Sequence, residues 1–252
     1  MNLTRAVRPL FYSRRKPSNR SKAAAMQPLL RVNAFPEFTS REFFVIAAMT
    51  ALMTADDLLF SDWLSKIDTY LAIDYAKKAL LLAACFATRT FRAAMARAFA
   101  APDIPWAGPG WLNPHVAILL VGTFLFDQGV TWMDAHINDL AGNPAFLTTP
   151  AYRDDLLKYF DLTFGLLCNA VAEEAFYRAI LIAALFSVIP RAAPCVILAG
   201  LVFGLVHWSQ GPISMAAIAV SGLAYGVLFC LTRSIIPGIA VHYLDNVIAF
   251  AT

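Results

Sequence analysis

The chain has 252 residues, of which 59% are hydrophobic and only 15% are charged, and its four cysteines show no C-x-x-C spacing. This composition excludes an ordinary soluble globular domain, which would carry more charge and less apolar surface. Because each crossing of a bilayer takes roughly 20 apolar helical residues, we predict an all-α polytopic membrane helix bundle with about seven transmembrane helices, within a range of about six to eight. The expected location is integral and multi-pass, in contact with the lipid bilayer.

The formal net charge of +3 is distributed unevenly. Residues 1–36 contain eight Lys and Arg side chains and no Asp or Glu, which leaves 20 − 8 = 12 basic against 17 acidic residues beyond. We therefore predict a basic, disordered N-terminal tail over 1–40 and a membrane helical domain over 41–252. A headgroup-binding arm and a targeting segment are alternatives for the tail. Nucleic acid is not an expected partner, because the remainder of the chain is acidic.

Apolar segments separated by Pro and Gly breaks, such as Gly211-Pro212, are the candidates for membrane-crossing helices. They lie at about 42–60, 70–88, 111–127, 159–188, 192–208, 213–231 and 236–250. The second segment carries Asp74, Lys77 and Lys78, so an interfacial amphipathic helix is an alternative for it.

Basic residues fall on alternate connections, in the tail, at 89–97, at Arg191 and at Arg233. Short loops rich in Lys and Arg tend to stay in the cytoplasm, so we predict a cytoplasmic N-terminus. Asp134 and Asp139 are assigned to a loop on the opposite side of the membrane.

Two pairs of glycines, Gly200 with Gly204 and Gly222 with Gly226, are each spaced by one helical turn. Small residues at this spacing let helix backbones approach closely in lipid. We expect these pairs to mark helix packing.

Three ionisable side chains, Glu173, Glu174 and Arg178, lie far from either end of the fourth segment. At membrane depth each costs about 2.5 to 3.5 kcal/mol on insertion scales, so such residues tend to face the bundle interior and to have a function. Glu174 and Arg178 are one turn apart and are expected to form an ion pair. Glu173 lies about 100° further round the helix and lacks that partner, which suits it to acid–base chemistry. A purely structural polar cluster is the alternative.

Two later segments add further polar groups. His207 stands near the end of one, and His242 and Asn246 lie one turn apart on the last. A carboxylate, two imidazoles and a carboxamide from three apolar segments indicate one shared site. His115 and His136 have no comparable partners and are expected to be interfacial or loop residues.

These residues form three motifs in order, E-E-x-x-x-R at 173–178, F-x-x-x-H at 203–207 and H-x-x-x-N at 242–246. In them the sequence resembles the CAAX protease and bacteriocin-processing family, also called CPBP or Abi, over about residues 160–250. The resemblance implies an intramembrane endopeptidase of the metallo- or glutamate type. Its substrate would be a peptide or protein in the membrane, and in some relatives three residues are removed after a prenylated cysteine.

Carried over by position, the resemblance implies that Glu173 activates water with help from His207. His242 and Asn246 would bind the oxyanion or a metal, and Glu174 and Arg178 would support the site. Zinc is one cofactor that the resemblance leaves open, with Glu173, His207 and His242 as candidate ligands, although no H-E-x-x-H motif occurs.

Two other classes compete with this interpretation. A rhomboid-type serine peptidase would use Ser221-Gly222 with His242, but Ala219 stands where its G-x-S-G motif needs glycine. That class also leaves the paired glutamates without a role. A non-enzymatic membrane immunity, accessory or transport protein would hold a buried polar cluster without chemistry. A transporter would be expected to show a repeated half, and none is visible in the sequence.

Overall fold

The computed structural model describes residues 37–59, 67–142, 145–146 and 156–251. Nearly all of the predicted basic tail lies outside the described residues. The described part is helical except for short connections and one two-residue antiparallel pair, β1 (Asp103–Ile104) with β2 (Gly108–Pro109). The all-α prediction is confirmed.

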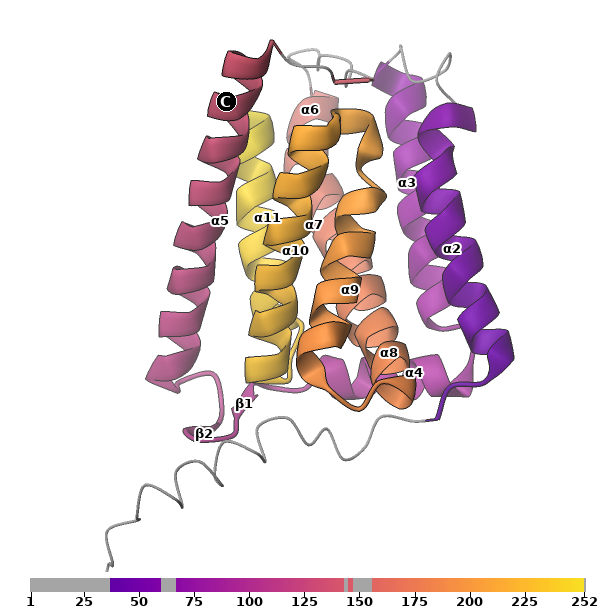
Figure 1. Cartoon of the computed structure of the whole chain (residues 1–252), viewed down its shortest axis with the longest axis vertical. Helices are drawn as coiled ribbons and strands as arrows, with labels where there is room; N and C mark the ends of the chain where they lie inside the picture. Colours follow the sequence, from indigo (N-terminus) through magenta and orange to yellow (C-terminus); the bar gives the residue numbers. More distant parts are fainter. Residues whose placement is uncertain (1–36, 60–66, 143–144, 147–155, 252) are drawn as a thin grey trace, which may run out of the picture. The chain divides into compact units, whose positions relative to one another are not determined.

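The first helices are α2 (Ser40–Leu59), α3 (Ile67–Cys85) and α4 (Arg89–Ala98). Helix α4 begins where the Thr88 hydroxyl accepts a hydrogen bond from the Phe91 amide, and it is bent by 101° from α3. It lies across one end of the bundle (Figure 1). The segment predicted at 70–88 is mainly α3, in which Lys78 is buried, and an interfacial position for it stays a prediction. Helix α4, which follows that segment, has exposed arginines.

Helix α5 (Pro114–Ala141) corrects the sequence prediction, because it continues 141 − 127 = 14 residues beyond the expected end of its segment. The Asn113 side chain caps its start, and Gly142 ends it in the left-handed conformation with φ of 68°. Asp134, which we expected in a loop, lies within α5 and accepts hydrogen bonds from Asn138 and Ser214. Local hydropathy predicted too early an end for this helix. Polar contacts to a neighbouring helix stabilise the residues beyond that predicted end.

The central helix is continuous over residues 156–188 and contains two π-helical stretches. It consists of α6 (Leu156–Phe160), the π-helical η2 (Asp161–Gly165), α7 (Leu166–Glu173), the π-helical η3 (Glu174–Ile182) and α8 (Ala183–Val188). Every side chain over 174–184 is buried. Because π-helical turns are rare and are frequent at functional sites, the position of η3 next to Glu173 is notable.

The last elements are α9 (Ala192–Leu205), the 3₁₀ turn η4 (Trp208–Gln210), α10 (Pro212–Thr232) and α11 (Ile236–Ala251). They match the predicted segments to within a few residues. Helices α9 and α10 pack through the predicted glycines, since a Cβ added at Gly204 would lie 2.5 Å from the Met215 carbonyl oxygen and one at Gly222 would lie 2.9 Å from the Phe203 ring. The expected role of the glycine pairs is confirmed.

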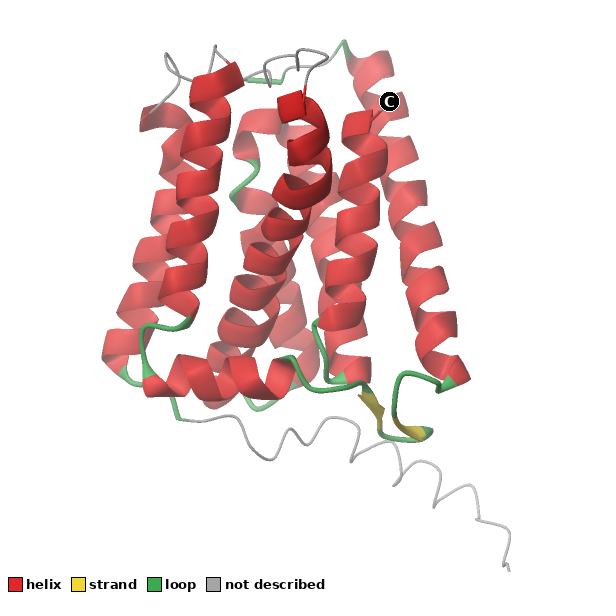
Figure 2. Ribbon diagram, turned by 180° about the vertical axis from the view of Figure 1, so that it is seen from behind, coloured by secondary structure: helices red, strands yellow, loops and turns green. Residues whose placement is uncertain are grey.

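Two described helices, α5 and α10, are long and apolar enough to cross a membrane, and α3 with α4 would add a third if they form one broken span. Helices α9 and α11 are apolar but shorter. The count of about seven spans stays a prediction. Helix α4 and the α8–α9 and α10–α11 connections lie at one end of the bundle (Figures 1 and 2). The arginines at 89–97, Arg191 and Arg233 thus share one end, as the orientation prediction requires, and the orientation itself stays a prediction.

Candidate active site

The two adjacent glutamates of the central helix both face His242 of α11. His242 Nδ1 is 3.2 Å from Glu174 Oε1, and His242 Nε2 is 3.5 Å from Glu173 Oε2. The two nitrogens lie on different edges of one imidazole ring, so side chains about 100° apart on a helix reach it together. Because a carboxylate oxygen only accepts, the Nδ1 contact is a hydrogen bond donated by the ring, whereas the Nε2 contact lacks hydrogen-bond geometry.

The expected ion pair between Glu174 and Arg178 is present, with Arg178 Nε 3.4 Å from Glu174 Oε2. Both side chains are buried, at 0% and 1% exposure. The guanidinium also lies over the Phe203 ring, 4.3 Å from its centroid, and 5.3 Å from the Tyr225 centroid. Two aromatic faces and a carboxylate thus surround a cation that apolar packing alone would not tolerate.

Helix α11 presents His242 and Asn246 one turn apart, as predicted. His242 is 5% exposed. The Asn246 Nδ2 group is buried and has no hydrogen-bond partner among the described residues, so its N–H donors are available. Gly238, one turn before His242, lets α11 approach the central helix closely, because a Cβ there would lie 2.7 Å from Glu174 Oε2.

His207 follows the end of α9 and contacts the cluster indirectly. Its Nδ1 lies 2.8 Å from the Phe203 carbonyl oxygen, which can only accept, so Nδ1 carries the proton and Nε2 is the acceptor in the neutral ring. Its ring packs against the Phe203 ring at 5.0 Å, and Phe203 in turn meets His242 at 6.0 Å. No hydrogen bond or ion pair joins His207 to Glu173 in the described part of the chain.

The sequence prediction missed two buried residues that contact this site. The Tyr225 ring stacks on His242, with centroids 5.3 Å apart, and its hydroxyl donates a hydrogen bond to Asp127 on α5. Asp127 is 0% exposed. The available signal was an acidic residue within an apolar segment, which indicates an inward-facing side chain with a partner.

The candidate metal ligands do not form a three-ligand set. Glu173 and His242 converge, but His207 hydrogen-bonds through Nδ1 to a carbonyl and contacts the pair only through Phe203. Over the residues that the structure describes, no group of three or more His, Cys, Asp and Glu side chains is arranged to hold a metal ion. The donor arrangement does not fit zinc, which takes at least three protein ligands. We therefore assign no reaction step to a metal ion.

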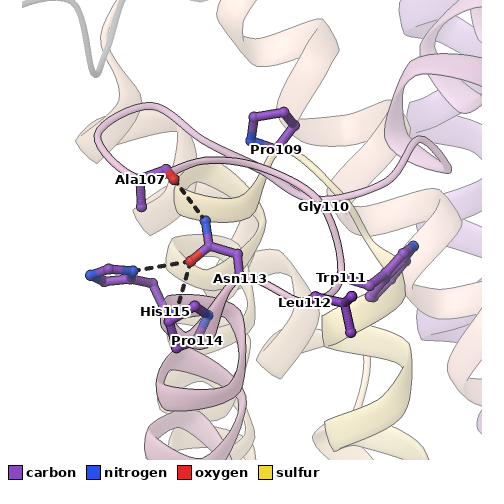
Figure 3. A pocket seen from close by; sticks show the side chains of 8 residues that line it. All are labelled: Ala107, Pro109, Gly110, Trp111, Leu112, Asn113, Pro114 and His115. Carbon is purple, nitrogen blue, oxygen red and sulfur yellow. Dashed lines mark hydrogen bonds between the residues drawn. The ribbon is translucent and has the colours of Figure 1, made fainter.

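A separate hollow of about 700 Å³ lies at the loop before α5 (Figure 3). Asn113 donates to the Ala107 carbonyl and accepts from the His115 amide, so these contacts serve the turn and the helix cap. None of the predicted site residues lines this hollow. His115 and His136 are both exposed and both lie within α5 rather than in a loop, with His136 stacked on Trp132, and an interfacial position stays a prediction.

The fold and the cluster define an all-helical bundle with membrane-crossing helices and a buried carboxylate–imidazole site. Residues 155–248 match the model of a protein family described as type II CAAX prenyl endopeptidase Rce1-like. This match confirms the resemblance found in the sequence, and it covers 248 − 155 + 1 = 94 of 252 residues. The chain matches no curated protein and no solved structure. Similarity to an endopeptidase family, with two helices that can span a bilayer, indicates an integral membrane hydrolase.

Proposed function

We propose that this protein is an intramembrane endopeptidase that hydrolyses a peptide bond with water activated by Glu173, in C-terminal processing of the CAAX type. The observation that supports this most strongly is the buried Glu173 Oε2, which has no hydrogen-bond partner among the residues that the structure describes and faces His242 Nε2 at 3.5 Å. A carboxylate oxygen in such a position has a lone pair free to accept a proton from water.

In the proposed reaction, a water molecule between Glu173 and the scissile carbonyl loses a proton to Glu173 as its oxygen attacks the carbonyl carbon. His207 assists as a second acceptor, because its Nδ1 contact to the Phe203 carbonyl leaves Nε2 unprotonated in the neutral ring. Glu173 then returns the proton to the leaving amine. The carboxylate thus acts first as general base and then as general acid.

The oxyanion of the tetrahedral intermediate would be stabilised from α11. Asn246 Nδ2 is a buried donor without a partner in the described part of the chain, and a protonated His242 ring can donate from Nε2 while Nδ1 stays on Glu174. Donors that are held in place before the reaction need no reorganisation as charge develops. Removal of one such donor from an enzyme raises the activation free energy of the reaction by about 2.7 to 4 kcal/mol.

Glu174 and Arg178 would support the chemistry rather than perform it. Glu174 holds the His242 ring through Nδ1, and Arg178 balances the Glu174 charge from the next turn. The family description names prenyl CAAX endopeptidases, so the proposed substrate is a membrane-bound peptide or protein whose C-terminus follows a prenylated cysteine.

The test uses protein purified in detergent, with cleavage of a prenylated CAAX peptide and of a membrane-peptide library as readouts. Glu173→Ala should abolish cleavage at unchanged thermal stability, and His242→Ala should abolish cleavage with some loss of stability, because its buried ring packs on Tyr225 and donates to Glu174. Asp139→Asn, at an exposed carboxyl on α5, should retain cleavage. Parallel reactions with a chelator test metal dependence. No cleavage of any substrate by the wild type, with variants that lose stability, would instead indicate a structural polar cluster in a binding or immunity protein.

A further inference from the structure

A buried pair of polar residues joins α5 to the site. Helix α5 lies outside the family-matched region of 155–248. The Tyr225 hydroxyl of α10 donates a hydrogen bond to Asp127 Oδ2 of α5, and the two residues are 2% and 0% exposed. Beside them, Gln128 of α5 donates to Asp245 Oδ1 of α11 at 2.6 Å. Side chains of α5 thus contact both α10 and α11, the helix that carries His242.

The Tyr225 ring lies against the face of the His242 imidazole. The two rings are 5.3 Å apart and nearly parallel, with an interplanar angle of 19°. Phe203 meets the same imidazole edge-on at 6.0 Å and 87°, and Glu174 accepts from its Nδ1. The stack restrains the plane of the imidazole ring, which a single hydrogen bond at Nδ1 would leave free to tilt.

We propose that Tyr225, anchored by Asp127, is a positioning residue that holds His242 Nε2 toward the reacting groups. This inference rests on the proposed function of His242. It assigns a role in the site to α5, which lies outside the matched region, through the chain Asp127–Tyr225–His242. The ring stack orients His242, and the hydrogen bond to Asp127 holds Tyr225 in the position that the stack requires.

The energetics of buried pairs favour a positioning role over a merely stabilising one. Replacing both members of a buried polar pair by apolar groups of similar shape is often neutral or stabilising, whereas removing one member leaves the other unsatisfied. If the pair serves stability alone, the double substitution should restore kcat together with stability. If the pair positions His242, stability should return while kcat stays low.

The experiment compares Tyr225→Phe, Asp127→Leu and the double variant in cleavage of a prenylated CAAX peptide, with thermal unfolding measured in parallel. Tyr225→Phe keeps the stack but loses the anchor, and we expect k_cat to fall on the order of tenfold with K_M unchanged. The double variant should regain thermal stability yet keep the low k_cat, because both single substitutions break the same hydrogen bond. Asp127→Asn, which still accepts from the hydroxyl, should rescue kcat, and Asp139→Asn, at an exposed carboxyl of the same helix, is the matched control.

Recovery of k_cat together with stability in the double variant, or wild-type k_cat in Tyr225→Phe, would overturn the positioning role. A readout without catalysis separates this from failure of the proposed function. In histidine-selective NMR of the four-histidine chain, Tyr225→Leu should shift the His242 ring signals by removing the ring current, and Tyr225→Phe, which keeps an aromatic ring but loses its anchor, should shift them less. Unshifted His242 signals in Tyr225→Leu would overturn the stack itself, even if the wild type cleaves no peptide.

Discussion

Replacement of Gly238 by alanine perturbs the contact between α11 and the central helix. An added Cβ would lie 2.7 Å from Glu174 Oε2, and ordinary van der Waals contact begins at 3.4 Å, so the carboxylate would have to withdraw by 3.4 − 2.7 = 0.7 Å. The same carboxylate holds His242 Nδ1 at 3.2 Å and Arg178 Nε at 3.4 Å. A withdrawal of this size would loosen both contacts.

The expected loss of activity follows from this displacement. Misplacement of a catalytic group by 1 Å can cost on the order of 100-fold, so we expect k_cat/K_M to fall by roughly 10- to 100-fold in Gly238→Ala. Overpacking typically lowers stability by about 1 to 3 kcal/mol, whereas alanine stabilises a helix by about 1 kcal/mol relative to glycine. The net loss of stability should therefore be about 0 to 2 kcal/mol, which leaves most of the protein folded while the rate falls.

The assay is steady-state cleavage of a prenylated CAAX peptide by detergent-purified protein, with thermal unfolding of the same samples. Gly129→Ala on α5 is the matched control, because a Cβ there meets nothing within 4 Å. It should keep the wild-type rate and equal or greater stability. Wild-type k_cat/K_M in Gly238→Ala, with stability raised as in the control, would refute the packing of Glu174 against α11.

Three further predictions test separate parts of the molecule. Asn246→Leu should lower k_cat by about 10²- to 10³-fold with little change in K_M, as expected for loss of an oxyanion donor, and an unchanged k_cat would remove Asn246 from the chemistry. Gly204→Val should destabilise the protein in thermal unfolding, because even a Cβ would lie 2.5 Å from the Met215 carbonyl, and a neutral effect would contradict the α9–α10 packing. Tyr75→Phe removes a 2.8 Å hydrogen bond to the buried Asp161 and should cost about 1 to 3 kcal/mol of stability. Its k_cat should change little, and a large loss of k_cat at full stability would contradict a structural role.

Much of the helical layout was predictable because local signals were strong. The Gly211-Pro212 break coincides with the start of α10, and the segment at 236–250 coincides with α11. The pairing of Glu174 with Arg178 followed from a spacing of four residues, and it survives in the π-helical η3. These features depend on a few neighbouring residues, which the sequence displays directly.

Features that depend on contacts between distant helices were not predictable. Helix α5 continues past its expected end because Asp134 accepts hydrogen bonds from Asn138 and from Ser214. Ser214 lies 80 residues further along the chain. The position of His242 between both glutamates depends on how α11 packs, and the motif spacing could indicate a shared site but not this geometry. The role of Asp127 could not be derived, because its partner Tyr225 is an unremarkable residue in an apolar segment.

The most direct test of the account is the rate at which wild type and Glu173→Gln release the C-terminal tripeptide from a farnesylated CAAX peptide. Glutamine has nearly the same size as glutamate but cannot take up the water proton. We predict tripeptide release by the wild type and a loss of roughly 10²- to 10⁴-fold in Glu173→Gln at equal thermal stability, since general base catalysis contributes a factor of that size. Equal rates in the two proteins would contradict Glu173 as the base that activates water.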